Sequence, residues 1–118
     1  MKLWNLASGS AGFTVGAADN DLLWTSPDLS RYDNVAISTD NPADVESSID
    51  GGLSWQTTVL SLEDVHAAAA VGTRVLTTAA GKVYRVAPGY RFSNIRVRQN
   101  GAGAVATLKV RAWNSLKG

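Results

Sequence analysis

The run Asp50-Gly51-Gly52 constrains the fold of this chain more than any other stretch of its sequence. Two kinds of side chain alternate in residues 45–49 before it and in residues 53–59 after it. This period of two is typical of β-strands, whose successive side chains point to opposite faces. Asp-Gly supplies the positive φ angles that a tight hairpin turn needs. The sequence therefore predicts a β-hairpin over residues 45–59.

Further β-rich segments predict an all-β fold. They cover residues 32–38, 73–78, 82–86, 94–99 and 105–113, and turn signals containing Gly, Pro, Asn or Asp separate them. Together with the hairpin they give about seven to eight short strands, which is typical of an antiparallel β-sandwich or jelly roll. One short helix is expected after Ser61, which suits a helix cap, and it ends near Gly72.

The chain has the size and composition of one globular domain, with 118 residues, of which 45% are hydrophobic and 18% charged. The predicted sandwich covers residues 31–118. Residues 1–30 are expected to form an N-terminal arm with a first short strand. This arm is rich in glycine, yet Trp4 and Phe13 in it need a surface to cover them. We expect the arm either to be loosely held or to lie on a neighbouring subunit through Trp4 and Phe13.

The composition excludes several classes of function. The chain has no cysteine, so it offers neither disulfides nor thiolate ligands for zinc. No stretch approaches the roughly 20 apolar residues of a membrane helix, and the first residues lack a signal-peptide pattern. His66 is the only histidine, and no nucleophile-elbow sequence accompanies it or nearby Asp64. Neither enzymatic activity nor a cofactor is therefore expected.

Acidic residues gather in one stretch of the sequence, as Asp40, Asp44, Glu46 and Asp50. Their carboxylates either form a solvated acidic edge or hold calcium through oxygen ligands. The spacing differs from that of an EF-hand loop, which favours the solvated edge over a metal site.

Charge is divided unevenly along the chain. Residues 1–64 contain all ten acids and two bases, a net charge of −8, whereas residues 65–118 contain nine bases and no acid, a net charge of +9. Either the two halves face each other as cross-strand ion pairs, or one pole of a subunit meets the opposite pole of its neighbour. The second arrangement suits head-to-tail association.

The last two predicted strands, residues 94–99 and 105–113, are expected to form a second hairpin. Their apolar residues share one face (Ile95, Val97, Ala106, Leu108, Val110 and Ala112). Four cations share the opposite face (Arg96, Arg98, Lys109 and Arg111). Like charges side by side on a sheet repel. The patch is therefore compensated by the acidic half of the chain, by an acidic partner protein or, least in keeping with a net charge of +1, by nucleic acid.

The four tryptophans divide into two expected groups, apart from Trp4 in the arm. Trp24 and Trp55 lie in apolar patterns and are predicted core residues. Trp113 is in register with the outward cations, beside Arg111, unless a bulge turns it inward. An exposed tryptophan next to an arginine is a good anchor for a protein interface. It is equally suited to stacking on a sugar ring.

Several runs of the sequence resemble small β-sandwich modules of tailed-phage structural proteins. These runs are Ser48-Ile49-Asp50-Gly51-Gly52-Leu53-Ser54-Trp55, Pro88-Gly89-Tyr90-Arg91-Phe92, Ile95-Arg96-Val97-Arg98 and residues 101–110. The likeness covers about residues 32–113. In such virion proteins the fold is a compact block, and the arm or loops make contacts within the particle. The resemblance implies a non-enzymatic protein of the virion, assembled in the host cytoplasm, that decorates and cements a capsid.

The resemblance also implies the partners of the chain. They are the major capsid protein or another virion protein, and further copies of the chain, with a trimer expected. Neither a membrane nor nucleic acid is expected as a partner. The contacts are expected from Trp4 and Phe13 in the arm and from the four cations and Trp113 at the other end. Two alternatives stay open: a module of the tail, baseplate or fibre, and a carbohydrate-binding module that uses Trp113 or a tyrosine.

Overall fold

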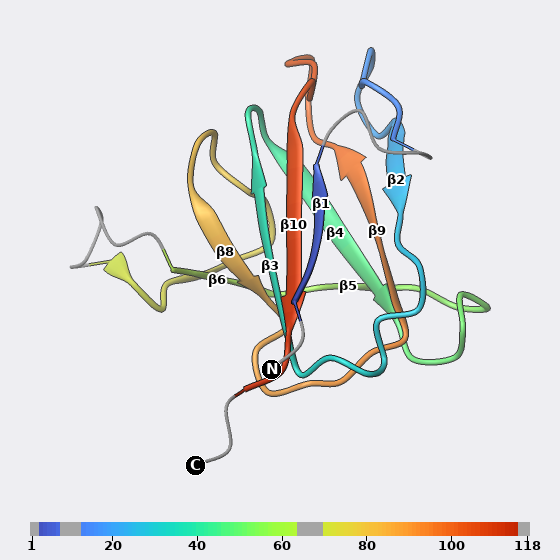
Figure 1. Ribbon diagram of the computed structural model, residues 1–118. Helices are drawn as coiled ribbons and strands as arrows, with labels where there is room; N and C mark the ends of the chain where they lie inside the picture. The colour runs from blue at the N-terminus through green and yellow to red at the C-terminus, as the bar shows by residue number, and fades with distance from the viewer. Residues whose placement is uncertain (1–2, 8–12, 64–69, 116–118) are drawn as a thin grey trace.

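The computed structural model of the chain describes residues 3–7 (backbone only), 13–63 and 70–115. They form ten strands in two antiparallel sheets (Figure 1). The strands are β1 (Leu3–Ala7), β2 (Leu22–Thr25), β3 (Asn34–Thr39), β4 (Ala43–Ser48), β5 (Gln56–Thr57), β6 (Leu60–Leu62), β7 (Arg74–Val75), β8 (Val83–Val86), β9 (Asn94–Gln99) and β10 (Leu108–Trp113). The predicted all-β class is confirmed. No helix within these ranges is long and apolar enough to cross a membrane.

The order of the strands is that of a jelly roll with an insertion. The six-stranded sheet has the order β1-β10-β3-β8-β6-β7, and the four-stranded sheet has the order β2-β9-β4-β5. If β6 and β7 are set aside, the other eight strands form two sheets in which early and late strands of the chain alternate. β6 and β7 extend the larger sheet beyond β8. Of the two predicted architectures, the structure has the jelly roll.

Apolar residues from both sheets meet in one core. Val35 and Ile37 of β3 are buried, and so are Ile95 and Val97 of β9, as their alternation predicts. The inward residues of β10 belong to the same cluster (Leu108, Val110 and Ala112). Trp24 of β2 is 3% exposed, which confirms its predicted place in the core. These side chains stabilise the fold because their burial removes apolar surface from water.

The predicted second hairpin is wrong. β9 lies between β2 and β4 in one sheet, and β10 lies between β1 and β3 in the other, so residues 100–107 cross from sheet to sheet. The alternation is right for both strands, but their apolar faces meet across the core instead of standing side by side. Two strands of one hairpin and two strands in facing sheets have the same pattern, so the sequence alone does not separate them. Ala106 is exposed, because the regular alternation begins only at Leu108.

The first predicted hairpin is confirmed in its pairing but not in its length. β4 pairs with β5 in antiparallel register, with Glu46 opposite Thr57. Seven residues connect them, and the Asp50 carboxylate organises this loop by accepting hydrogen bonds from the amide and hydroxyl of Ser54. Gly51 and Gly52 have φ angles of 75° and 96°, as the turn prediction requires.

Trp55, the last residue of the hairpin loop, lies outside the core. Only Gln56 and Thr57 form a strand after the turn, so the expected alternation over residues 53–59 is not continued. Trp55 is only half-buried, and its ring lies 4.6 Å from the guanidinium carbon of Arg96, which points outward from β9. Its predicted place in the core is therefore wrong.

The expected arm is built into the sandwich where the structure describes it. β1 pairs with β10 along its whole length, at one edge of the larger sheet. β2 is the expected first short strand. Between them, the amide of Thr14 donates to Leu23 and the amide of Gly16 donates to Val105. Gly16 packs so closely against Gln99 that a methyl group there would lie 1.7 Å from the Gln99 Oε1.

The predicted helix is tested only at its ends. Ser61 belongs to strand β6, so the prediction that it caps a helix is wrong. Residues 64–69, with Asp64 and His66, lie outside the described residues. Gly72 has a φ angle of 88° in the turn that leads to β7.

Candidate protein-binding surfaces

The four cations predicted to form one patch are divided between the two outer faces of the sandwich. Arg96 and Arg98 project from β9 on the four-stranded sheet, whereas Lys109 and Arg111 are exposed on β10 of the six-stranded sheet. The single patch is therefore wrong, and the cause is the sheet assignment of the two strands.

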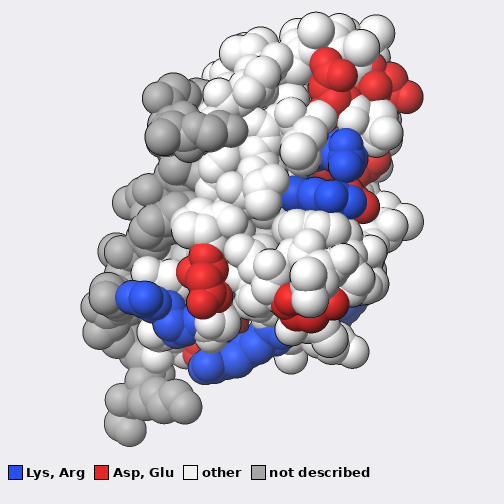
Figure 2. Space-filling view, turned by 90° about the vertical axis from the view of Figure 1, so that its right-hand side faces the viewer, with Lys and Arg blue, Asp and Glu red and all other residues white. Residues whose placement is uncertain are grey.

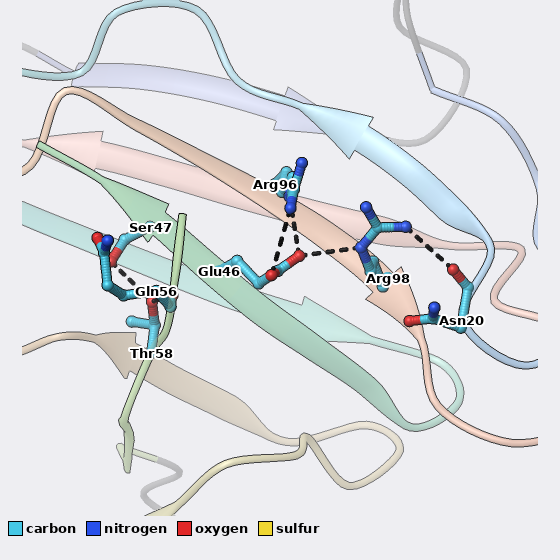
Figure 3. A network of polar contacts seen from close by, with 7 residues as sticks. All are labelled: Asn20, Glu46, Ser47, Gln56, Thr58, Arg96 and Arg98. Atoms are coloured by element: carbon cyan, nitrogen blue, oxygen red, sulfur yellow. Dashed lines mark hydrogen bonds and ion pairs between the residues drawn. The ribbon is translucent and has the colours of Figure 1, made fainter. Parts of the chain in front are cut away.

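Arg96 and Arg98 share one carboxylate. Glu46 of β4 stands opposite Arg96 in the register. The Arg96 Nε donates to Glu46 Oε1 at 2.8 Å, and the Arg98 Nε donates to the same oxygen at 2.9 Å (Figure 3). A second Arg96 nitrogen reaches Glu46 Oε2 at 3.3 Å, and Arg98 also donates to the carbonyl of Asn20. The cluster therefore holds two positive charges against one negative charge.

The electrostatics of this cluster stabilise the ionised carboxylate. The hydrogen bond from Arg96 is the main cause that lowers the pKa of Glu46, and Arg98 adds to it, whereas partial burial acts in the opposite direction. The three side chains are 23–26% exposed, so solvent screens the pairs only in part. They line a polar hollow of about 430 Å³ together with Asn20, Asp44, Val45 and Thr57.

Trp113 projects outward, as its register predicts, but it is half-buried. The guanidinium of Arg85 from β8 lies 5.1 Å from its ring centre. Arg85 also pairs with Glu63 at 3.3 Å and donates to Asn34 at 2.8 Å. One face of the Trp113 ring is thus occupied by a side chain of the same subunit. Arg111, the expected neighbour, is exposed.

The two aromatic residues of the expected arm have different outcomes. Phe13 is half-buried and packs against the core cluster, so it is a contact within the subunit. The backbone of Trp4 pairs with Ala112 in β10. The side chain of Trp4 lies outside the described residues, and its expected role as a contact stays a prediction.

The four acidic residues of the predicted calcium stretch serve different partners. Asp40 accepts from the amides of Ala106 and Thr107, and so fixes the connection before β10. Asp44 accepts from the Thr77 hydroxyl at 2.6 Å and from an asparagine amide. Asp50 orders its own loop, and Glu46 binds the two arginines. Within the described ranges, no group of three acidic or histidine side chains is placed to hold a metal ion.

Acidic and basic side chains intermingle on the face that Figure 2 presents, with red and blue atoms next to one another. The ion pairs of the described residues all join an acid of residues 1–64 to a base of residues 65–118, as Glu46 with Arg96 and Arg98, and Glu63 with Arg85. The alternative in which the two halves face each other therefore accounts for these pairs.

A groove that the sequence did not reveal lies at the end of the sandwich. Its volume is about 460 Å³. It is lined by residues from three places: the end of β4 (Ser47 and Ile49), the segment from β5 toward β6 with Arg74 of β7, and the loop before β9 (Ala87, Pro88, Tyr90, Arg91 and Phe92). Ile49 is 73% exposed and Tyr90 is 74% exposed. Alternation gives Ile49 the same parity as the buried Val45, but β4 ends one residue before it. No signal in the sequence marks that end.

Comparison with known proteins identifies a similar fold but no family. No protein-family model matches the chain, and no curated protein matches its sequence. Among solved structures, the chain is similar to the SPBc2 prophage-derived protein YomS, with a TM-score of 0.61 over 95% of each chain and 7% sequence identity. At this identity the likeness shows a shared fold, and that fold occurs in a prophage-derived protein.

Proposed function

We propose that this chain is a non-enzymatic structural protein of a tailed-phage particle, which binds the major capsid protein or another virion protein and thereby decorates and cements the shell. The observation that carries the proposal is the match of its fold to a prophage-derived protein over 95% of both chains. Jelly rolls are frequent in viral capsid domains, which is consistent with this assignment. Because one fold serves many functions, the surface must supply the rest of the argument.

The surface supports a binding role rather than a chemical one. The charged clusters of the described residues are used within the subunit: Glu46 neutralises part of the Arg96 and Arg98 charge, and Asp40 and Asp50 fix loops. Large apolar side chains remain exposed at one end, with Ile49 at 73% and Tyr90 at 74%. Exposed apolar surface of this kind is typical of sites that bind another macromolecule. Many weak contacts of this sort, repeated over a shell, add up through avidity.

Co-sedimentation tests the proposal. Purified protein is mixed with purified heads of the phage or prophage whose genome encodes the chain, and bound copies per particle are quantified over a range of salt concentrations. We expect saturable binding with a copy number that scales with the number of shell subunits. Protein that stays in the supernatant at every salt concentration contradicts a virion role. Saturation at a few copies per particle contradicts shell decoration and assigns the chain to the tail or baseplate.

A further inference from the structure

We propose that the groove formed by Ile49, residues 56–59 and residues 87–92 docks an apolar segment of the partner protein that carries carboxylates. This inference rests on the proposed function, because it names the surface through which the chain binds within the particle. For brevity this surface is called the end groove.

The end groove combines a buried floor with exposed apolar walls. Phe92 is 7% exposed and belongs to the core cluster, whereas Val59, Ile49 and Tyr90 beside it are 37%, 73% and 74% exposed. Apolar side chains that are kept in water stabilise a complex when a partner covers them. A concave site of this volume is in the range of surfaces that bury a ligand or an anchoring side chain.

Hydrogen bonds within the subunit hold one side of the end groove, at residues 58, 59 and 87, in place. The Thr58 amide donates to the Val45 carbonyl at 3.0 Å, and the Ala87 amide donates to the Val59 carbonyl at 2.9 Å. Residues 58 and 59 are thus tied to both sheets. The Thr58 hydroxyl also donates to Ser47 at 2.8 Å (Figure 3). A preformed surface loses little conformational entropy on binding, which favours its use as a docking site.

Two arginines define the chemistry of the occupant. Arg74 of β7 and Arg91 of the loop before β9 line the end groove and are both exposed, and none of the described residues that line it is acidic. Within residues 13–63 and 70–115, neither arginine has an ion pair, in contrast to Arg85, Arg96 and Arg98. Guanidinium groups bind carboxylates in strong, often bidentate contacts. The complementary partner is therefore apolar with at least one carboxylate beside its apolar residues.

The same charges disfavour a second copy of the chain as the occupant. A two-fold contact places the same surface on both sides of the interface. If end groove met end groove, the arginines of both copies would gather with no carboxylate among the described lining residues to neutralise them. Like charges brought together in an interface oppose association.

Variants in the exposed walls test this inference without disturbing the core. Ile49→Ser with Tyr90→Ser removes the apolar walls, and Arg74→Glu with Arg91→Glu reverses the charge. As matched controls, Leu53→Ser removes an apolar residue that is 88% exposed outside the lining, and Lys82→Glu reverses a cation elsewhere. Unchanged unfolding midpoints establish that each variant is folded. Affinity for purified particles is then measured for the wild type and every variant.

We expect both end-groove variants to lose affinity by about tenfold or more, as is usual for interface anchors, while both controls bind like the wild type. Arg74→Lys with Arg91→Lys should retain most of the binding. If the wild type binds and the end-groove variants bind equally well, this inference fails and the proposed function stands. If the wild type does not bind, both fail. A wild-type dimer that the end-groove variants convert to a monomer shows that a second copy is the occupant and overturns the inference.

Discussion

The shared carboxylate of Glu46 gives the sharpest quantitative prediction of this structure. Glu46→Gln keeps the size of the side chain but removes its charge. The glutamine oxygen at the Oε1 position can still accept from both Nε atoms, at 2.8 Å and 2.9 Å, but as a neutral group. Its amide NH2 takes the place of Oε2 and faces the second Arg96 nitrogen, so that hydrogen bond is lost together with the attraction of a carboxylate for both guanidinium groups. It also leaves Arg96 and Arg98 as neighbouring like charges on one face of β9.

The magnitude follows from burial. Hydrogen bonds to charged groups contribute about 1.5–3 kcal/mol when buried, whereas exposed ion pairs contribute about 0.2–1 kcal/mol. The three side chains are 23–26% exposed, which places this cluster between the two limits. We expect Glu46→Gln to lower the free energy of unfolding by about 1–2 kcal/mol. For a domain of this size, that lowers Tm by roughly 4–8 °C.

Urea denaturation followed by circular dichroism measures this loss, and an unchanged m-value shows that the denatured state is the same. Glu63→Gln is the matched control, because Glu63 makes a single pair with Arg85 at 3.3 Å and is 34% exposed. We expect the control to lose about 0.5 kcal/mol or less. Equal losses in the two variants, or a loss below about 0.3 kcal/mol for Glu46→Gln, would refute the account of the shared carboxylate.

The pH dependence supplies an independent check on the sign. The folded pKa of Glu46 is lowered from its ordinary value of 4.5, so the unfolded chain binds its proton first as the pH falls. The stabilisation is therefore complete above about pH 4.5 and is lost as the pH falls through the folded pKa. The difference between wild type and Glu46→Gln should shrink over that acidic range. A difference that stays constant down to complete protonation would contradict this linkage.

Three further predictions follow from the contacts of the fold. Gly16→Ala should destabilise by about 2–3 kcal/mol in thermal unfolding, because its methyl group would lie 1.7 Å from the Gln99 oxygen, and an unchanged Tm would contradict the packing. Hydrogen bonds from Ser48 and Ser54 lower the pKa of Asp50 to about 2, so its carboxylate should stabilise the fold above pH 3.8 and lose that effect toward pH 2. A pKa of Asp50 near 3.8, measured by NMR titration, would contradict this prediction. Ile95→Ala, at a fully buried site, should cost about 3 kcal/mol in urea unfolding, and a loss below about 1 kcal/mol would count against its place in the core.

The sequence predicted which side of a strand is buried better than it predicted which strands are neighbours. Val35, Ile37, Ile95 and Val97 are all buried as their alternation indicated. Alternation indicates only whether each side chain points into the core or toward solvent. The same alternation is expected whichever sheet the strand belongs to. The assignment of β9 and β10 to different sheets depends on the path of residues 100–107, and nothing in their local pattern records that path.

The burial of Trp55 was predicted wrongly because the sequence does not show where the strands of the first hairpin end. Trp55 was assigned an inward position by extending the alternation through the hairpin, but β4 ends at Ser48 and β5 begins at Gln56. The intervening loop interrupts the alternation of inward and outward side chains, because its glycines adopt positive φ angles and its backbone is not pleated like a strand. Ile49 of the end groove lies in this same loop, so the strand pattern does not give its exposed position.

The topology explains how the charge division along the chain disappears in space. In a jelly roll, late strands insert between early ones: β9 lies between β2 and β4, and β10 lies between β1 and β3. Acids of the first half therefore stand beside bases of the second half, and the opposed poles of the sequence become cross-strand pairs such as Glu46 with Arg96.

The two arginines of the end groove lie outside this interleaving. Arg74 is on β7, the edge strand of the insertion, and Arg91 is in the loop before β9. The strand beside Arg74 is β6, and its residues Leu60, Ser61 and Leu62 include no acid, whereas Arg96 stands opposite Glu46 of β4. The topology that pairs Arg96 with Glu46 thus leaves Arg74 and Arg91 without an ion pair among the described residues. An electrostatic contribution to docking at the end groove should accordingly depend on Arg74 and Arg91 and be insensitive to Lys82, which lies outside the lining.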